Sequence, residues 1–187
     1  MKMYTAKWTD EIDELTELFT QEFGNLTGEE LNWTSHPKSW SVGQVVEHII
    51  TLNRTYFPLF TDIAEGVYRP PFMAKLGFVV RALGNSIYKS VLPETQRKTR
   101  TFPLWEPSKS NVPENILAEF GAHQEELKSH IQKLGNALNE GLVISSPASR
   151  NVVYTLEKAL DIIVVHERRH LQQARRMDMS RRSQERI

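Results

Sequence analysis

The sequence predicts an all-α protein, a four-helix bundle with a long crossover between helices 2 and 3 and an extra helix in the crossover. Three observations carry this prediction. Four long segments repeat apolar residues at intervals of three and four, which is the spacing of one helix face. No stretch alternates apolar and polar residues as a half-buried strand does. The connection between the second and third segments, residues 66–113, is long and has prolines near both ends.

The composition fits one compact domain. The chain has 187 residues, of which 40% are hydrophobic and 25% charged. We therefore expect a single domain over residues 1–187, with residues 178–187 as a frayed polar tail.

The first helix is predicted over residues 9–23. Thr9 suits the N-cap position, and the acidic residues that follow it complement the positive end of the helix dipole. The predicted buried face is Trp8, Ile12, Leu15 and Phe19. Gly24 and Asn25 are expected to end the helix.

The second helix is predicted to begin after Ser41. Ser41 and Gln44 form a capping-box pattern, and the helix should continue to about residue 65 unless Pro58 kinks it or ends it early. His48 shares its apolar stripe with Val45, Leu52 and Leu59. Trp40 is expected to anchor the core at this entrance or to line a pocket.

The crossover is expected to hold the extra helix. Its apolar stripe is Phe72, Leu76, Val79, Leu83, Ile87 and Val91. Lys75, Arg81 and Lys89 are among its polar positions, and residues 67–113 contain 8 basic and 2 acidic residues. A basic amphipathic helix of this kind packs on its own protein or a partner subunit, or lies on a membrane surface.

The third helix is predicted to open at Asn111, Pro113 and Glu114. Its apolar stripe is Leu117, Phe120, Leu127, Ile131, Leu134 and Leu138. Gln124 falls within the stripe, where it is either a core amide or a polar group directed at a metal cavity. His123 and His130 lie beside the stripe and are expected at the surface or its boundary.

The fourth helix is predicted over residues 155–177, after a turn region with Gly141, Pro147 and Asn151. Its apolar stripe is interrupted by His166 and His170, which lie one turn apart on one side of the helix. Two imidazoles so placed can hold one metal ion. His48 is the third candidate ligand, because it also lies on a face predicted to be buried.

Several classes of function are excluded or disfavoured. Without cysteine the chain has no disulfide, thiolate metal site or cysteine nucleophile, so a metal would be held by imidazole and carboxylate. No apolar run reaches the length of a membrane span and no signal-peptide pattern opens the chain, so a cytoplasmic protein is expected. The formal net charge of zero argues against bulk nucleic-acid binding.

The segments WSVGQVVEH, which ends at His48, and HERRHLQQ, which begins at His166, resemble those of the DinB family, the DinB/YfiT-like putative metalloenzymes. The resemblance extends over the whole chain. It implies a four-helix bundle with a long crossover, frequent homodimers, and a divalent metal, usually zinc or nickel, bound by His48, His166 and His170. It also implies that Gln173 marks the family motif. Many members have a further histidine directly before the last ligand, where this chain has Arg169. We expect the metal site to survive that change and the charge near the cavity mouth to alter substrate choice.

Three functions remain open from the sequence. Three imidazoles with an open fourth position favour catalytic zinc, which can deprotonate water or a thiol. Relatives with known activity imply the first function, transfer of an external low-molecular-weight thiol such as bacillithiol to an electrophilic small molecule. The others are hydrolysis by metal-bound hydroxide and a noncatalytic helical binding or scaffolding module.

The sequence names no catalytic acid or base. Glu47 and Glu167 adjoin histidines, but a helical neighbour points about 100° away, so both are expected in solvent. Gln173, one turn beyond His170, is predicted to contact a metal ligand or the substrate, with a locally bonded buried amide as the alternative.

Overall fold

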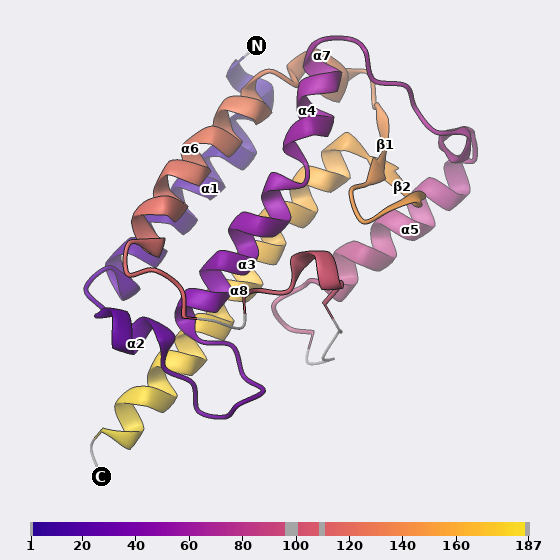
Figure 1. The fold of residues 1–187 in the computed structure, drawn as a ribbon. Coiled ribbons are helices and arrows are strands. Elements are labelled where there is room, and N and C mark those ends of the chain that lie inside the picture. The colour runs from indigo at the N-terminus through magenta and orange to yellow at the C-terminus, as the bar shows by residue number, and fades with distance from the viewer. Residues whose placement is uncertain (1, 96–100, 109–110, 186–187) are drawn as a thin grey trace.

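The protein is a four-helix bundle with a crossover helix and a small hairpin on one side, as the computed structural model shows (Figure 1). The structure describes residues 2–95, 101–108 and 111–185. The bundle helices are α1 (Lys2–Phe23), α3 (Val42–Arg54), α6 (Ile116–Gln132) and α8 (Leu156–Gln184). Each packs against two others, α1 and α3 both lying against α6 and α8. Their apolar faces meet in one continuous core.

The shorter elements connect these helices. They are α2 (Gly28–Asn32), α4 (Phe57–Ala64), η1 (Phe72–Lys75), α5 (Gly77–Ser90), η2 (Pro103–Trp105), α7 (Gly135–Asn139), β1 (Val143–Ser146) and β2 (Ser149–Thr155). The predicted crossover helix is therefore confirmed as α5. None of the helices in the described ranges combines the length and apolar character needed to cross a membrane.

Local signals placed three helix boundaries correctly. Ser41 caps α3 through the predicted box, since its hydroxyl accepts from the Gln44 backbone N–H and the Gln44 side chain accepts from the Ser41 N–H. Pro58 lies in the first turn of α4, so the predicted helix is split, with α3 ending at Arg54. Thr155 caps α8 by accepting a hydrogen bond from the Lys158 N–H.

The predicted start of the first helix is wrong. The helix α1 begins at Lys2, and Thr9 lies inside it with its hydroxyl 3.2 Å from the Ala6 carbonyl. Nothing in the preceding segment breaks a helix. Trp8 is held on the inner side by a hydrogen bond from its indole N–H to Asp161, so packing against α8 extends the helix beyond the local cap signal.

The prediction that residues 178–187 form a frayed tail is also wrong for those of them that the structure describes. The helix α8 continues to Gln184, and the side chains of Asp178 and Arg181 are buried. Arg181 pairs with Asp178 and reaches Glu30 of α2. These ion pairs give the polar end of α8 a tertiary partner, which a composition argument does not detect.

The hairpin of β1 and β2 replaces the predicted turn region. The strands pair antiparallel with Ile144 opposite Tyr154, and both of these side chains are buried. The segment from 152 to 154 is apolar throughout, so it lacks the alternation expected of a half-buried strand. The strands are short and pair only with each other, which leaves the bundle class unchanged.

Candidate metal centre

The structure brings His48, His166 and His170 together. His48 projects from α3, and the other two project from successive turns of α8. The Nε2 atom of His166 lies 3.4 Å from that of His48 and 3.0 Å from that of His170. Within the described chain these are the three residues whose ligand atoms form a group suited to a metal ion, all lying within 4.8 Å of one another. The group contains no carboxylate.

Acceptors outside the group orient two of the rings. The Nδ1 of His48 lies 2.5 Å from the backbone carbonyl of Trp105, and the Nδ1 of His170 lies 3.0 Å from the side-chain oxygen of Gln173. We assign the ring proton of each to Nδ1, because an oxygen acceptor requires a donor there. Both Nε2 atoms then present lone pairs toward His166. Gln173 therefore contacts His170, and the role of His170 as a metal ligand stays a prediction.

A divalent ion fits the chemistry of this donor set. His166 can supply at most one proton to the two lone pairs that face its Nε2, and its Nδ1 is buried without a partner. A cation among the rings would satisfy all three Nε2 atoms. Two nitrogen ligands of tetrahedral zinc lie about 3.3 Å apart when each Zn–N bond is about 2.05 Å, which is close to the two separations observed.

The environment keeps the three imidazoles neutral, which is the state that binds metals. Burial lowers the pKa of His48 below its ordinary value. Burial also lowers the pKa values of His166 and His170 well below the ordinary value, and the neighbouring histidines and Arg169 lower them further. His48 is 2% exposed, whereas His166 is half-buried and forms the more accessible side of the group.

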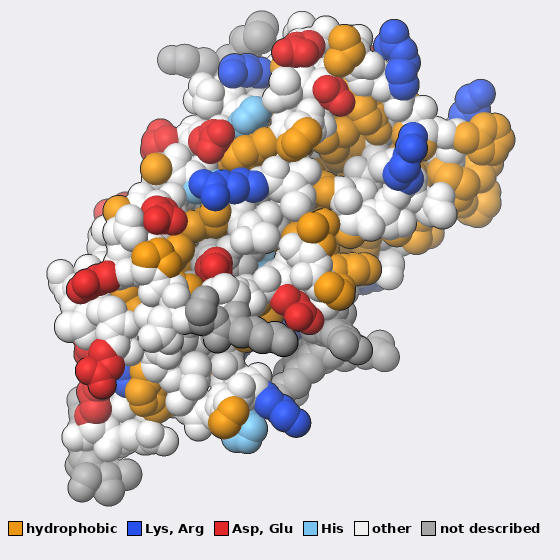
Figure 2. All heavy atoms as spheres, in the orientation of Figure 1, with side chains coloured by type: hydrophobic (Ala, Val, Ile, Leu, Met, Phe, Trp, Pro, Cys, Tyr) orange, Lys and Arg blue, Asp and Glu red, His pale blue; other side chains and the backbone are white. Residues whose placement is uncertain are grey.

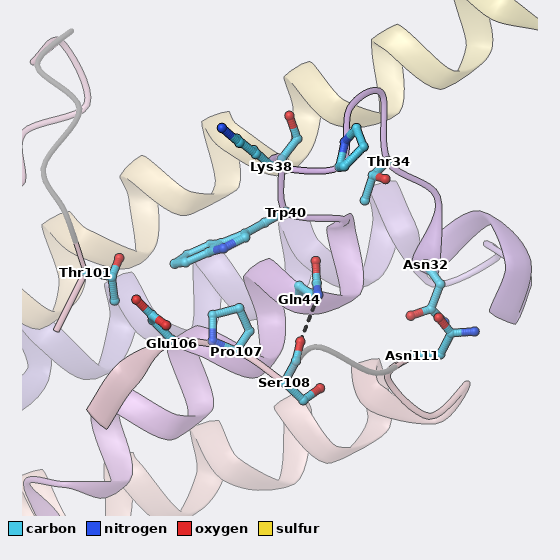
Figure 3. A pocket seen from close by; sticks show the side chains of 12 residues that line it. Asn32, Thr34, Lys38, Trp40, Gln44, Thr101, Glu106, Pro107, Ser108 and Asn111 are labelled. Carbon is cyan, nitrogen blue, oxygen red and sulfur yellow. Dashed lines mark hydrogen bonds between the residues drawn. The ribbon is translucent and has the colours of Figure 1, made fainter. Parts of the chain in front are cut away.

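Trp40 lies between the histidines and a pocket, and it also packs against the core, so it has both of its predicted roles. Its ring centroid lies 4.8 Å from that of His48, and its ring is stacked 6.1 Å from that of His170. The same side chain borders a pocket of about 600 Å³, with Lys38 on one side and Gln44 and Glu106 on others (Figure 3). The pocket is therefore next to the candidate metal centre and has a mostly polar lining.

The loop after η2, which lines this pocket with residues 106–108, is held by hydrogen bonds from two residues of α3. The Gln44 side chain donates to the Ser108 carbonyl over 2.9 Å, as drawn in Figure 3. The Glu47 carboxylate accepts from the backbone N–H and hydroxyl of Ser108. Glu47 is half-buried, so the prediction that it is a solvated surface residue is wrong. Its role here is to position the loop that carries the Trp105 carbonyl close to His48.

Arg169 lies beside the histidines in sequence, and two of its hydrogen bonds within the described ranges go to the crossover. Its guanidinium donates to the backbone carbonyls of Ser90 and Leu92, at the end of the crossover helix α5. The side chain therefore attaches the crossover to α8 beside the histidine group. Its effect on substrate choice stays a prediction.

Glu167 is one of two buried titratable residues that the sequence reasoning placed at the surface. It is 0% exposed, and its two oxygens accept from Asn53 of α3 at 2.6 Å and from Gln124 of α6 at 2.8 Å. Burial raises its pKa to about 7, although the two hydrogen bonds oppose the shift. The expectation of a solvated Glu167 is wrong because α3 and α6 cover that side of α8. Of the two roles predicted for Gln124, the structure shows the core amide, because its side chain donates to Glu167 and does not face the histidines.

His123 is buried, contrary to prediction, whereas His130 lies at the boundary as predicted. The His123 ring is 1% exposed and stacks on Phe57, and neither of its nitrogens has a hydrogen-bond partner within the described chain. Burial, assisted by Arg54, lowers its pKa from 6.5 to about 4. Only the neutral ring is suited to this position.

His123 is expected to make the fold sensitive to acid. The unfolded chain binds a proton at this residue below pH 6.5 while the folded chain does not until about pH 4. The contribution of neutral His123 to the free energy of unfolding is therefore complete above pH 6.5. About 3 kcal/mol of that free energy is lost as the pH falls toward 4. We expect His123→Leu to remove that share of the pH dependence. Urea unfolding of wild type and variant at pH 7.5 and pH 4.5 measures it, with exposed His36→Ala as the control; equal acid sensitivity in His123→Leu and wild type would contradict it.

Comparisons with known proteins place the fold in context. A sequence model described as the DinB superfamily matches residues 11–174. Among solved structures, the chain is similar to YfiT from Bacillus subtilis, which is described as a probable metal-dependent hydrolase with an unusual four-helix bundle topology. That match has a TM-score of 0.63 and 18% sequence identity, and it covers 98% of this chain and 89% of the other. No curated protein matches the chain.

Proposed function

This chain belongs to the DinB superfamily, and we propose that it is a divalent-metal-dependent enzyme that activates a small nucleophile for attack on a small-molecule substrate. The observation that carries the proposal is the convergence of three Nε2 atoms from α3 and α8 with two Nδ1 atoms engaged by outer acceptors. Structural zinc sites have four protein ligands, whereas catalytic sites commonly have three and leave one position for water or substrate. Three imidazoles without a carboxylate match the second class.

The protein's own residues prepare this site. The Trp105 carbonyl and Gln173 orient the rings of His48 and His170, and such outer contacts raise metal affinity by holding the ligands in place. Trp40 shields one side from solvent. A divalent cation held there supplies Lewis acidity, which lowers the pKa of a water or thiol beside it. Zinc and nickel are the candidates that the family resemblance implies, and both accept imidazole ligands.

Thiol transfer is the first candidate reaction. Among the described residues, no carboxylate lies in the histidine group to act as a general base. A thiol needs no such base, because a thiol bound to a cation is deprotonated outright, whereas bound water is not. In this reaction the thiol loses its proton, its sulfur forms a bond to an electrophilic carbon, and the leaving group departs with the electron pair of the broken bond. The polar pocket on the other side of Trp40 is lined by none of the three histidines, so we propose that it receives the polar remainder of a low-molecular-weight thiol and not its sulfur.

Hydrolysis is the second candidate. YfiT, whose structure is similar, is described as a probable metal-dependent hydrolase. The same three-histidine arrangement can activate water, as it does in carbonic anhydrase. A water nucleophile would then cleave an ester or amide whose leaving group lies in the pocket.

A paired screen distinguishes these reactions. Protein loaded with zinc or nickel is tested for conjugation of several low-molecular-weight thiols to aryl halides and for hydrolysis of esters and amides. We expect turnover in one of the two assays, and His48→Ala should reduce that turnover more than about 100-fold because the cation is lost. The control variant His36→Ala should retain the wild-type turnover. Silence in both screens with the metal bound would leave the noncatalytic module. The predicted homodimer and cytoplasmic location stay predictions.

A further inference from the structure

The connection from α4 into α5 exposes aromatic and basic side chains together. Phe72 is 74% exposed and Phe78 is 69% exposed, although both are large and apolar. We define the crossover surface as the exposed side chains Val67, Arg69, Phe72, Lys75, Phe78, Arg81 and Lys89. Figure 2 shows hydrophobic side chains beside Lys and Arg at the end of the molecule where η1 and the start of α5 lie. Exposed aromatic patches of this kind commonly mark interaction sites.

The crossover surface is not the packing face of α5. The inward side of that helix is formed by Val80 and Gly84, which are buried. At Gly84 the helix approaches so closely that a Cβ would lie 3.1 Å from the Cβ of Tyr154. Phe78, Arg81 and Lys89 follow the opposite side at helical spacing, so α5 packs on β2 and α8 while presenting these residues outward. The predicted stripe is therefore wrong at Phe72, which is exposed, and it omits the two buried residues of α5.

The charge of this segment has one sign. Residues 67–92 contain 4 basic residues and no acidic residue. None of the four forms an ion pair with any residue in the described ranges of the chain. Lys75 instead lies over the ring of Phe72, with its Nζ 5.6 Å from the ring centroid. The cations are thus available to an external anionic partner, with aromatic rings between them.

We propose that the crossover surface binds the anionic face of a lipid bilayer. A bilayer interface supplies a partner for both kinds of side chain. Its anionic headgroups would pair with the lysines and arginines, and its apolar layer would bury Phe72 and Phe78. A symmetric contact between two copies of this surface would instead bring like charges together without an anion. A single-stranded nucleic acid would meet the basic residues and stack bases on the phenylalanines, but it would offer Val67 no apolar layer. The charge pattern therefore favours a membrane as the occupant.

The test is cosedimentation with sucrose-loaded vesicles. One set contains phosphatidylcholine alone, and the other contains three parts phosphatidylcholine to one part phosphatidylglycerol. We expect binding to the anionic set, little binding to the neutral set, and loss of binding in concentrated salt, where charges on the surface are screened. Lys75→Glu should weaken binding roughly thirty-fold because it reverses one charge. Phe78→Ser should weaken it roughly ten-fold through lost apolar burial.

Matched controls use exposed residues elsewhere. Met179 is a large exposed apolar side chain on α8, and Lys133 is an exposed cation after α6, so Met179→Ser and Lys133→Glu should bind as the wild type does. All four substitutions alter exposed side chains, and a thermal melt verifies that each variant is folded. Failure of the folded wild type to bind anionic vesicles would overturn the proposal. Equal loss in the controls, a dimer dissociated by Phe78→Ser without vesicle binding, or tighter binding to single-stranded DNA than to vesicles would overturn it as well.

Discussion

Purified wild-type protein is expected to hold close to one divalent ion per chain, and His166→Ala is expected to lose almost all of it. His166 supplies the Nε2 atom that lies near those of both other rings, so its removal leaves only two imidazole ligands. Elemental analysis after desalting measures the loss. Chelation of the wild type should lower its melting temperature by roughly 10 °C, because an ion present at about 1,000 times its Kd adds about 4 kcal/mol to the folded state.

The control for this experiment is another histidine. His36 is exposed, lies in the connection before α3, and hydrogen-bonds locally to the Lys38 N–H. His36→Ala should therefore keep the full metal content and the full response to chelation. Retention of the ion by His166→Ala would remove that residue from the ligand set, and a wild-type protein free of metal after growth with zinc and nickel would count against the metal centre itself.

Glu167→Ala is expected to destabilise the fold by about 3–5 kcal/mol at pH 7. The carboxyl group receives one amide from α3 and one from α6, so its loss leaves the Asn53 and Gln124 donors without a partner in the core. It also leaves a cavity among buried residues. Urea unfolding at fixed metal concentration measures the change.

Two companion variants separate the carboxyl network from a general effect on α8. Glu157 lies on the same helix and is exposed, so Glu157→Ala should change stability by less than about 0.5 kcal/mol. Glu167→Gln keeps the shape and one acceptor oxygen, and should therefore lie between the two. Similar losses in Glu167→Ala and Glu157→Ala would show that the buried hydrogen bonds contribute little.

Local sequence patterns predicted the histidine group because the relevant geometry lies within single helices. The four-residue spacing of His166 and His170 sets their common side, and the capping box at Ser41 sets the phase of α3 that turns His48 inward. Apolar neighbours along each stripe then indicate which side faces the core. These signals extend over one or two helical turns, so a single sequence contains them in full.

The same reasoning failed for Glu167 and His123, whose surroundings come from other helices. Each lies beside the main apolar stripe of its own helix, where a periodic pattern predicts partial exposure. Glu167 is covered by the helices that carry Asn53 and Gln124, and His123 is covered by Phe57. A wider buried sector is produced by the way in which three helices pack, and no spacing within one helix encodes it.

By itself, the sequence determined the helical class, the capped starts of α3 and α8, and the side of each helix on which the three histidines lie. Only the tertiary structure decided which groups complete the centre, since the Trp105 carbonyl lies 57 positions from His48 and carries no side-chain signal. It also decided that α8 extends beyond residue 177 through the ion pairs of Arg181, and that η1 and α5 present Phe72 and Phe78 outward. Helical periodicity acts over a few residues, whereas burial, backbone acceptors and ion-pair partners depend on chain segments that folding alone brings together.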